Sequence, residues 1–130
     1  PITLEDVKKQ AHRIHEGDMI FLHTGYDKFF REENWQPYPQ IDQDALAFLL
    51  SFKPKIIGTD ASGIEIPGEK TQELDGEPNH VACFANGTAI VESLTNLEAI
   101  ADCRPTVFVL ALKMEKMDAS PVRIIAIKDL

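Results

Sequence analysis

The sequence lacks the features that mark membrane proteins and nucleic-acid-binding proteins. No apolar run approaches the roughly 20 residues that are needed to cross a bilayer, and no signal peptide is recognisable. Lys and Arg total 13 against 21 Asp and Glu, which gives a formal net charge of −8, and the basic residues do not cluster. The average surface would repel a phosphate backbone, so we expect no nucleic acid and no membrane as a partner.

Cysteine is scarce, and the motifs of several enzyme classes are missing. Cys83 and Cys103 form no CxxC pair, which is typical of free thiols in a reducing cytoplasm rather than of a disulfide framework. No Ser or Cys lies in a nucleophile motif such as GxSxG, and no glycine-rich phosphate loop is present. The missing motifs leave acyl-enzyme chemistry and nucleotide binding without support. The free thiols favour a cytoplasmic location.

The apolar pattern of the first half predicts alternating helices and strands. The chain has 130 residues, 44% of them hydrophobic, which suits a single domain over residues 1–130. Thr3 is placed to cap a helix over residues 4–15, and Asp42 is placed to cap a second helix. Apolar runs at 19–23 and 55–60 are short and rich in strand formers. This order predicts an α/β fold with parallel strands.

The second half of the chain predicts shorter elements. We expect a surface excursion over 62–78, a short helix over 79–85, a strand over 88–92, a helical turn over 97–101 and a terminal strand pair over 106–114 and 122–127. The expected fold is therefore a mixed sheet with flanking helices. The irregular segment 28–40 carries aromatic residues, including Trp35 and Tyr38, and is typical of a substrate lid or a subunit contact.

His80 and Glu92 are the strongest candidates for metal ligands. An imidazole and a carboxylate together suit zinc, manganese or iron. The Asn86-Gly87 pair between them is a turn signal that could fold the two side chains toward each other. Spacing alone is a weak signal, because a His and a Glu twelve positions apart occur by chance in most proteins.

Other polar residues have both a structural and a functional interpretation. Asp60 ends an expected strand, where α/β proteins place working groups, but it could equally cap a turn. Arg123 begins an apolar strand and needs an anionic partner, for which a buried carboxylate is favoured over a substrate anion. His12 and His15 share a helical face but lie among charged residues, which indicates solvated side chains. His23, within an apolar run, is expected to be a hydrogen-bonded core residue.

Several segments occur together in the order typical of one enzyme family. They are 17–25, Ile57-Gly-Thr-Asp60, Asn79-His80, 87–97 and Asp118-Ala-Ser-Pro-Val-Arg123. On these segments the chain resembles, over residues 17–127, the cyclase family that includes bacterial kynurenine formamidase. The part from His80 to Leu97, followed by Ser-Pro-Val-Arg, is the most specific.

The resemblance implies a fold, a cofactor and a reaction. The fold is of the swivelling β/β/α type, the cofactor is one or two divalent metal ions, usually zinc or manganese, and the reaction hydrolyses a small-molecule amide such as N-formylkynurenine or a cyclic amide. The His and Glu of the family's second motif are metal ligands, and they fall on His80 and Glu92 of this sequence.

The family's N-terminal motif, His-X-Gly-Thr-His-X-Asp-X-Pro, has no counterpart here. None of the four histidines is followed by Gly-Thr-His. A hydrolytic metal needs about three protein ligands and an open position, so two ligands alone would bind it weakly. The chain is thus expected to be the C-terminal portion of a longer or cleaved enzyme, to take ligands from another chain of a homo-oligomer, or to be a catalytically silent, truncated relative that serves as an oligomerisation or binding domain.

Overall fold

The computed structural model describes residues 1–33, 35, 37–65 and 76–128, which form two compact units. The first unit is Pro1–Leu97 and the second is Glu98–Leu130. The expectation of one family domain over residues 1–130 stays a prediction. In the part of the chain that the structure describes, no helix has the length and apolarity that a membrane span requires.

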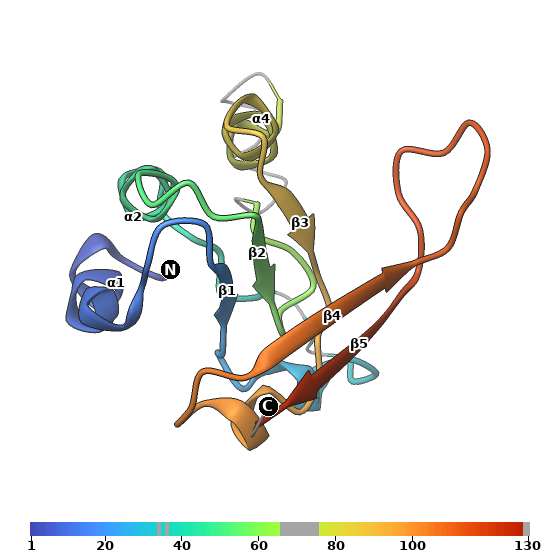
Figure 1. Ribbon diagram of the computed structural model, residues 1–130, viewed down its shortest axis with the longest axis horizontal. Helices are drawn as coiled ribbons and strands as arrows, with labels where there is room; N and C mark the ends of the chain where they lie inside the picture. Colours follow the sequence, from blue (N-terminus) through green and yellow to red (C-terminus); the bar gives the residue numbers. More distant parts are fainter. Residues whose placement is uncertain (34, 36, 66–75, 129–130) are drawn as a thin grey trace. The chain divides into compact units, whose positions relative to one another are not determined.

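A parallel sheet of three strands lies at the centre of the first unit (Figure 1). Its order is β1 (Met19–Leu22), β2 (Ile56–Thr59), β3 (Ala89–Val91), and each neighbouring pair is parallel. All three strands fall within the predicted runs. Because parallel strands end at the same edge of a sheet, the residues that follow β1, β2 and β3 are brought to one edge.

Helices before and between the strands bury the apolar residues of this unit. The helical segments are α1 (Leu4–Gln10), η1 (Ala11–Arg13), η2 (Tyr26–Phe29), α2 (Gln43–Leu50) and α4 (Pro78–Ala85), and a 3-10 turn, η3 (Leu97–Ile100), follows β3 where the first unit ends. Helix α2 contacts both α1 and α4. The core consists of Val7, Ile41, Ala45, Leu46, Leu49, Leu50, Ile57, Ile64 and Cys83. The predicted α/β class with flanking helices is confirmed.

The start of α1 is the predicted one, but its end comes earlier. Thr3 is the N-cap, and its hydroxyl accepts from the Asp6 N–H in a reciprocal capping box. The helix tightens into η1, and the chain becomes extended at Ile14. The helix predicted over 4–15 is thus a shorter α-helix followed by a 3-10 turn.

The second unit is built around an antiparallel pair of strands, β4 (Thr106–Ala111) and β5 (Val122–Ile127). This confirms the predicted terminal strand pair. Within 98–128, no described residue is fully buried, and large apolar side chains are exposed. Arg123 is also exposed, and no carboxylate of the described residues pairs with it, so the expected buried partner is not found there.

Two expectations for the first unit are wrong. Residues 62–78 were expected to lie on the surface, yet Gly63, Ile64 and Glu65 are buried. They are covered because the segment after β2 contacts the start of α4, where the Asn79 N–H donates to Glu65. Residues 66–75 of that range lie outside the described residues. His23 was expected in the core, but β1 ends at Leu22 and the imidazole is 37% exposed.

Candidate metal-binding site

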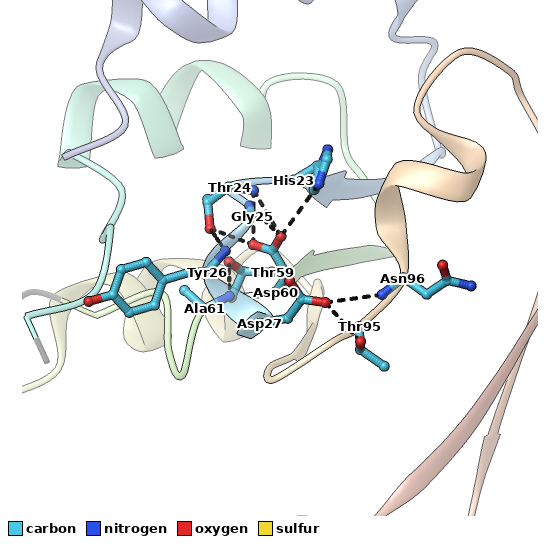
Figure 2. Close-up of polar contacts among 10 residues, drawn as sticks. All are labelled: His23, Thr24, Gly25, Tyr26, Asp27, Thr59, Asp60, Ala61, Thr95 and Asn96. Atoms are coloured by element: carbon cyan, nitrogen blue, oxygen red, sulfur yellow. Dashed lines mark hydrogen bonds and ion pairs between the residues drawn. The ribbon is translucent and has the colours of Figure 1, made fainter. Parts of the chain in front are cut away.

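Asp60 follows β2 and fixes the turn that leaves β1 (Figure 2). Its carboxylate accepts hydrogen bonds from the Thr24 N–H at 2.9 and 3.0 Å, the Gly25 N–H at 2.7 Å and the Thr24 hydroxyl. The His23 Nε2 atom lies 4.0 Å from the Asp60 Oδ2 atom, and the Asp60 side chain is 1% exposed. Asp60 thus has a structural contact, but with the backbone of a turn 35 and 36 residues earlier in the chain rather than with its own local turn.

A second carboxylate joins this turn to the segment that follows β3. Asp27 accepts from the Thr95 hydroxyl at 2.8 Å and from the Asn96 N–H at 3.3 Å (Figure 2). The Thr95 hydrogen bond is the main cause that lowers the pKa of Asp27 below its usual value. The carboxylates of Asp60 and Asp27 thus hold two loops at the carboxyl edge of the sheet, the turn after β1 and the segment after β3.

His80 and Glu92 are brought together by the helix α4 and the strand β3, which follow each other in the chain and are in contact. Gly87, with a φ of 74°, makes the connection, and its N–H donates to Phe84 at the end of α4. The predicted turn is thus confirmed, and the His80 Nε2 atom lies 3.5 Å from the Glu92 Oε1 atom.

Glu65 contacts the opposite side of the His80 ring. Its Oε2 atom lies 3.2 Å from the His80 Nδ1 atom and accepts from the backbone N–H groups of Asn79 and His80 at 3.0 and 3.2 Å. The same segment is anchored at Ile64, whose N–H donates to the Glu92 Oε1 atom at 3.1 Å. The imidazole therefore lies between two carboxylates, one buried and one partly exposed.

Tyr38 completes this group of side chains. A Cβ atom at Gly63 would lie 3.0 Å from the Tyr38 hydroxyl and 3.3 Å from the Glu92 Oε1 atom, so both approach the same glycine. Burial, followed by the charges of Glu92 and Glu65, raises the pKa of Tyr38 above its usual value. A tyrosine phenol is protonated at neutral pH, and the raised pKa keeps it so at higher pH, so the hydroxyl can donate a hydrogen bond. We call Tyr38, Glu65, His80 and Glu92 the His80 cluster.

The remaining candidates lie apart from the His80 cluster. Trp35, predicted with Tyr38 as a substrate or interface residue, is 41% exposed. His12 and His15 are exposed on the surface, as predicted. Among the described residues, none of these three forms a hydrogen bond or an ion pair with the cluster.

The chemistry of the His80 cluster suits a divalent cation. Two donors at ~2.1 Å from a tetrahedral ion lie about 3.4 Å apart, and the Nε2 and Oε1 atoms of His80 and Glu92 lie 3.5 Å apart. The two side chains remain 22% and 32% exposed, so an ion can reach them. Within 1–33, 35, 37–65 and 76–128, however, no group of three or more His, Cys, Asp or Glu side chains is arranged to hold a metal ion. At this point the described residues thus offer two candidate ligands, His80 and Glu92.

Sequence reasoning missed Glu65 and Gly63. Both lie in a Gly-, Pro- and Glu-rich stretch without periodicity, which gave no sign of burial. One signal was available: Glu65 stands between two isoleucines, Ile64 and Ile66, a few residues after the strand predicted to end at Asp60. A carboxylate just beyond a parallel strand lies at the edge where α/β proteins place their sites.

The cysteines allow a test of packing around α4. Burial, with a smaller effect of the Glu65 charge, raises the pKa of Cys83 to about 11, and the residue is 0% exposed. Cys103 is partly exposed. We expect titration with a chromogenic disulfide at pH ~8 to modify one thiol in the folded protein and the second only after unfolding, because the thiolate is the reactive form. Rapid reaction of both thiols, or of Cys83 in a Cys103→Ser variant, would contradict the described packing of α4.

Comparison with known proteins identifies relatives for this chain. The family profile described as "Putative cyclase" matches residues 1–66. An uncharacterized protein of Methanocaldococcus jannaschii is 28% identical over 128 residues, covering 97% of this chain and 61% of the relative.

Several solved structures have a fold similar to that of this chain. A potential metal-dependent hydrolase with cyclase activity is 28% identical with a TM-score of 0.75, and a predicted metal-dependent hydrolase from Bacillus stearothermophilus is 29% identical with a TM-score of 0.76. They match 95% and 96% of this chain, which covers 56% of each. An isatin hydrolase bound to the product analogue thioisatinate, at 24% identity and a TM-score of 0.79, shares the fold, and this chain covers 51% of it. The chain thus spans little more than half of these structures.

Proposed function

Because the chain belongs to the putative cyclase family, we propose that it contributes His80 and Glu92 as two metal ligands of an amide hydrolase. The observation that carries this proposal is the position of the His80 ring, with Glu65 on one side and the Glu92 carboxylate 3.5 Å away on the other. The similarity to two metal-dependent hydrolases over 95% and 96% of the chain supports the same function.

Each residue of the His80 cluster has a role in this proposal. The imidazole and carboxylate ligands suit zinc or manganese. A divalent ion, when bound, polarises an amide carbonyl and lowers the pKa of a coordinated water. Tyr38 donates a hydrogen bond to the substrate carbonyl, since its protonated hydroxyl and the Glu92 carboxylate approach the same glycine, Gly63. We propose a small formamide or cyclic amide as the substrate.

The further ligands come from outside the described residues. A hydrolytic centre holds about three protein ligands and one open position, whereas His80 and Glu92 are two. We propose that a preceding segment of a longer polypeptide, or a neighbouring chain in an oligomer, supplies the others. The coverage of 56% of the two hydrolase structures supports this, because those proteins contain polypeptide that has no counterpart here.

Metal retention tests the proposal directly. Because two ligands bind a metal weakly, the purified chain is brought to equilibrium by dialysis against a fixed concentration of zinc or manganese and its bound metal is measured there, beside His80→Ala and a matched His12→Ala control on an exposed helical site. We expect metal in the wild type and in His12→Ala, and a large loss in His80→Ala, because the imidazole is one of only two described ligands. Equal retention in all three proteins would reject His80 as a ligand.

A catalytically silent oligomerisation domain is the second candidate function. It is favoured by the second unit, in which Phe108, Leu110, Ile125 and Ile127 are all exposed. A two-stranded sheet is marginally stable alone and needs a covering surface. Sedimentation and metal analysis of the same protein together distinguish the candidates: an oligomer that binds no metal supports the silent domain, and a chain that binds metal through His80 supports the enzyme.

A further inference from the structure

Glu65 is anchored to α4 independently of the His80 ring. The Glu65 residue is 6% exposed, and its Oε2 atom accepts from the N–H groups of Asn79 and His80. These are among the N–H groups that have no partner inside a helix, and the helix dipole also favours negative charge there. No side chain caps α4 from the N-cap residue Glu77. The carboxylate of Glu65 thus takes the place of a local cap, and the backbone fixes its position.

Asn79 holds the Glu65 segment against α4. Its Nδ2 atom donates to the carbonyl oxygens of Ile41 and Ile64, both at 2.8 Å, and Asn79 is 0% exposed. The residue before Glu65 and the residue before His80 are therefore joined by a buried hydrogen bond. This connection leaves the Glu65 carboxylate little freedom relative to the His80 ring.

The contact between Glu65 and the ring favours one of the two neutral tautomers of His80. An ionised carboxylate only accepts hydrogen bonds, and the Glu65 Oε2 atom is 3.2 Å from the Nδ1 atom, whereas the Glu92 Oε1 atom is 3.5 Å from the Nε2 atom. The shorter contact favours a proton on Nδ1. In the neutral imidazole, the Nε2 atom then has a lone pair, which faces the Glu92 Oε1 atom. Two acceptors at 3.5 Å are unfavourable alone and favourable when both bind one cation.

We propose that Glu65 is a positioning residue, which holds His80 as the Nδ1-protonated tautomer and thereby directs the Nε2 lone pair toward the same point as Glu92. A carboxylate behind a ligating imidazole fixes the ring orientation and increases the basicity of the ligand. The binding of a cation at this point rests on the proposed function, but the tautomer of the His80 ring does not.

The test compares Glu65→Gln with Glu77→Gln. Glu77 is exposed and lies at the same end of α4, so its variant removes an equal charge without touching the ring. Long-range ¹H–¹⁵N spectra of metal-free protein, recorded about two pH units above the usual histidine pKa of ~6.5, report the tautomer, and loss of the signals in His80→Asn identifies the ring. Calorimetry with zinc chloride then gives the affinity of each protein.

We expect the Nδ1-protonated tautomer in the wild type and in Glu77→Gln, and a shift toward the Nε2-protonated form in Glu65→Gln. Zinc affinity is expected to fall by roughly 10- to 100-fold in Glu65→Gln and to stay unchanged in Glu77→Gln. Unchanged far-ultraviolet circular dichroism shows that the fold is kept. An Nε2-protonated His80 in the folded wild type overturns the proposal. This outcome is measured on the wild type alone, so it does not depend on whether a variant folds.

The two proposals fail separately. In one outcome the wild type has the predicted tautomer but binds no more zinc than His80→Asn. The role of Glu65 in positioning His80 is then supported, and the metal function of this chain is rejected. In the other outcome the wild type binds zinc through His80, but Glu65→Gln does not change the tautomer. The metal function is then supported, and the role of Glu65 is rejected.

Discussion

Replacing Asp60 with alanine is expected to lower the free energy of unfolding by about 3–5 kcal/mol, because three part-buried donors lose the carboxylate that accepts from them. The Thr24 and Gly25 N–H groups and the Thr24 hydroxyl would all lose their acceptor. These groups are part-buried, so water replaces the carboxylate only in part. Urea denaturation followed by circular dichroism measures the change.

Two further variants show whether the hydrogen bonds cause this loss. Asp60→Asn keeps one oxygen acceptor and should lose less stability than Asp60→Ala. Asp102→Ala removes a carboxylate that is 83% exposed, and it should stay within about 0.5 kcal/mol of the wild type. An Asp60→Ala protein as stable as the Asp102→Ala protein would show that the turn after β1 does not depend on Asp60.

The elements that could be predicted from the sequence are those with local signals. Thr3 and Asp6 form the expected capping box because they lie within one turn of each other. The strands β1 and β2 are short apolar runs with turn residues after them, and Asn86-Gly87 ends α4 as a turn pair should. In each case the neighbouring residues determine the conformation.

The interactions between distant residues could not be predicted in this way. Glu65 caps α4 from fourteen residues before Asn79, and no local pattern distinguishes it from the solvated acids of its segment. Asp60 binds a turn 36 residues before it, although its sequence position suggested a cap of its own turn. The His80 and Glu92 pair was found through family resemblance, since their spacing alone is common.

The structure explains how these two residues, twelve positions apart in the sequence, become neighbours. The helix α4 and the strand β3 bring the donors of His80 and Glu92 to one point, and Glu65 and Ile64 orient them from the segment after β2. All of these residues belong to the first unit. The ligands that complete the site under our proposal must therefore approach the exposed side of this pair.

Replacing Gly58 with alanine is expected to lower the free energy of unfolding by about 2–3 kcal/mol through overpacking. Gly58 lies in β2 beside Phe21 of β1. An added Cβ atom would lie 2.6 Å from the Phe21 Cδ1 atom and 2.9 Å from the Leu94 Cδ1 atom. The backbone φ of Gly58 is not in the left-handed region, so the cost comes from the side chains alone. Urea denaturation again measures it.

A second substitution separates overpacking from other effects of the alanine. Phe21→Leu removes the ring that the new Cβ atom would meet, and alone it is expected to destabilise the protein. If the Phe21 ring causes the cost, the double variant Gly58→Ala, Phe21→Leu should lose less stability than the sum of the two single variants. Strict additivity would instead show that Phe21 yields to the methyl group at no cost, and that the close contact across β1 and β2 does not constrain this position.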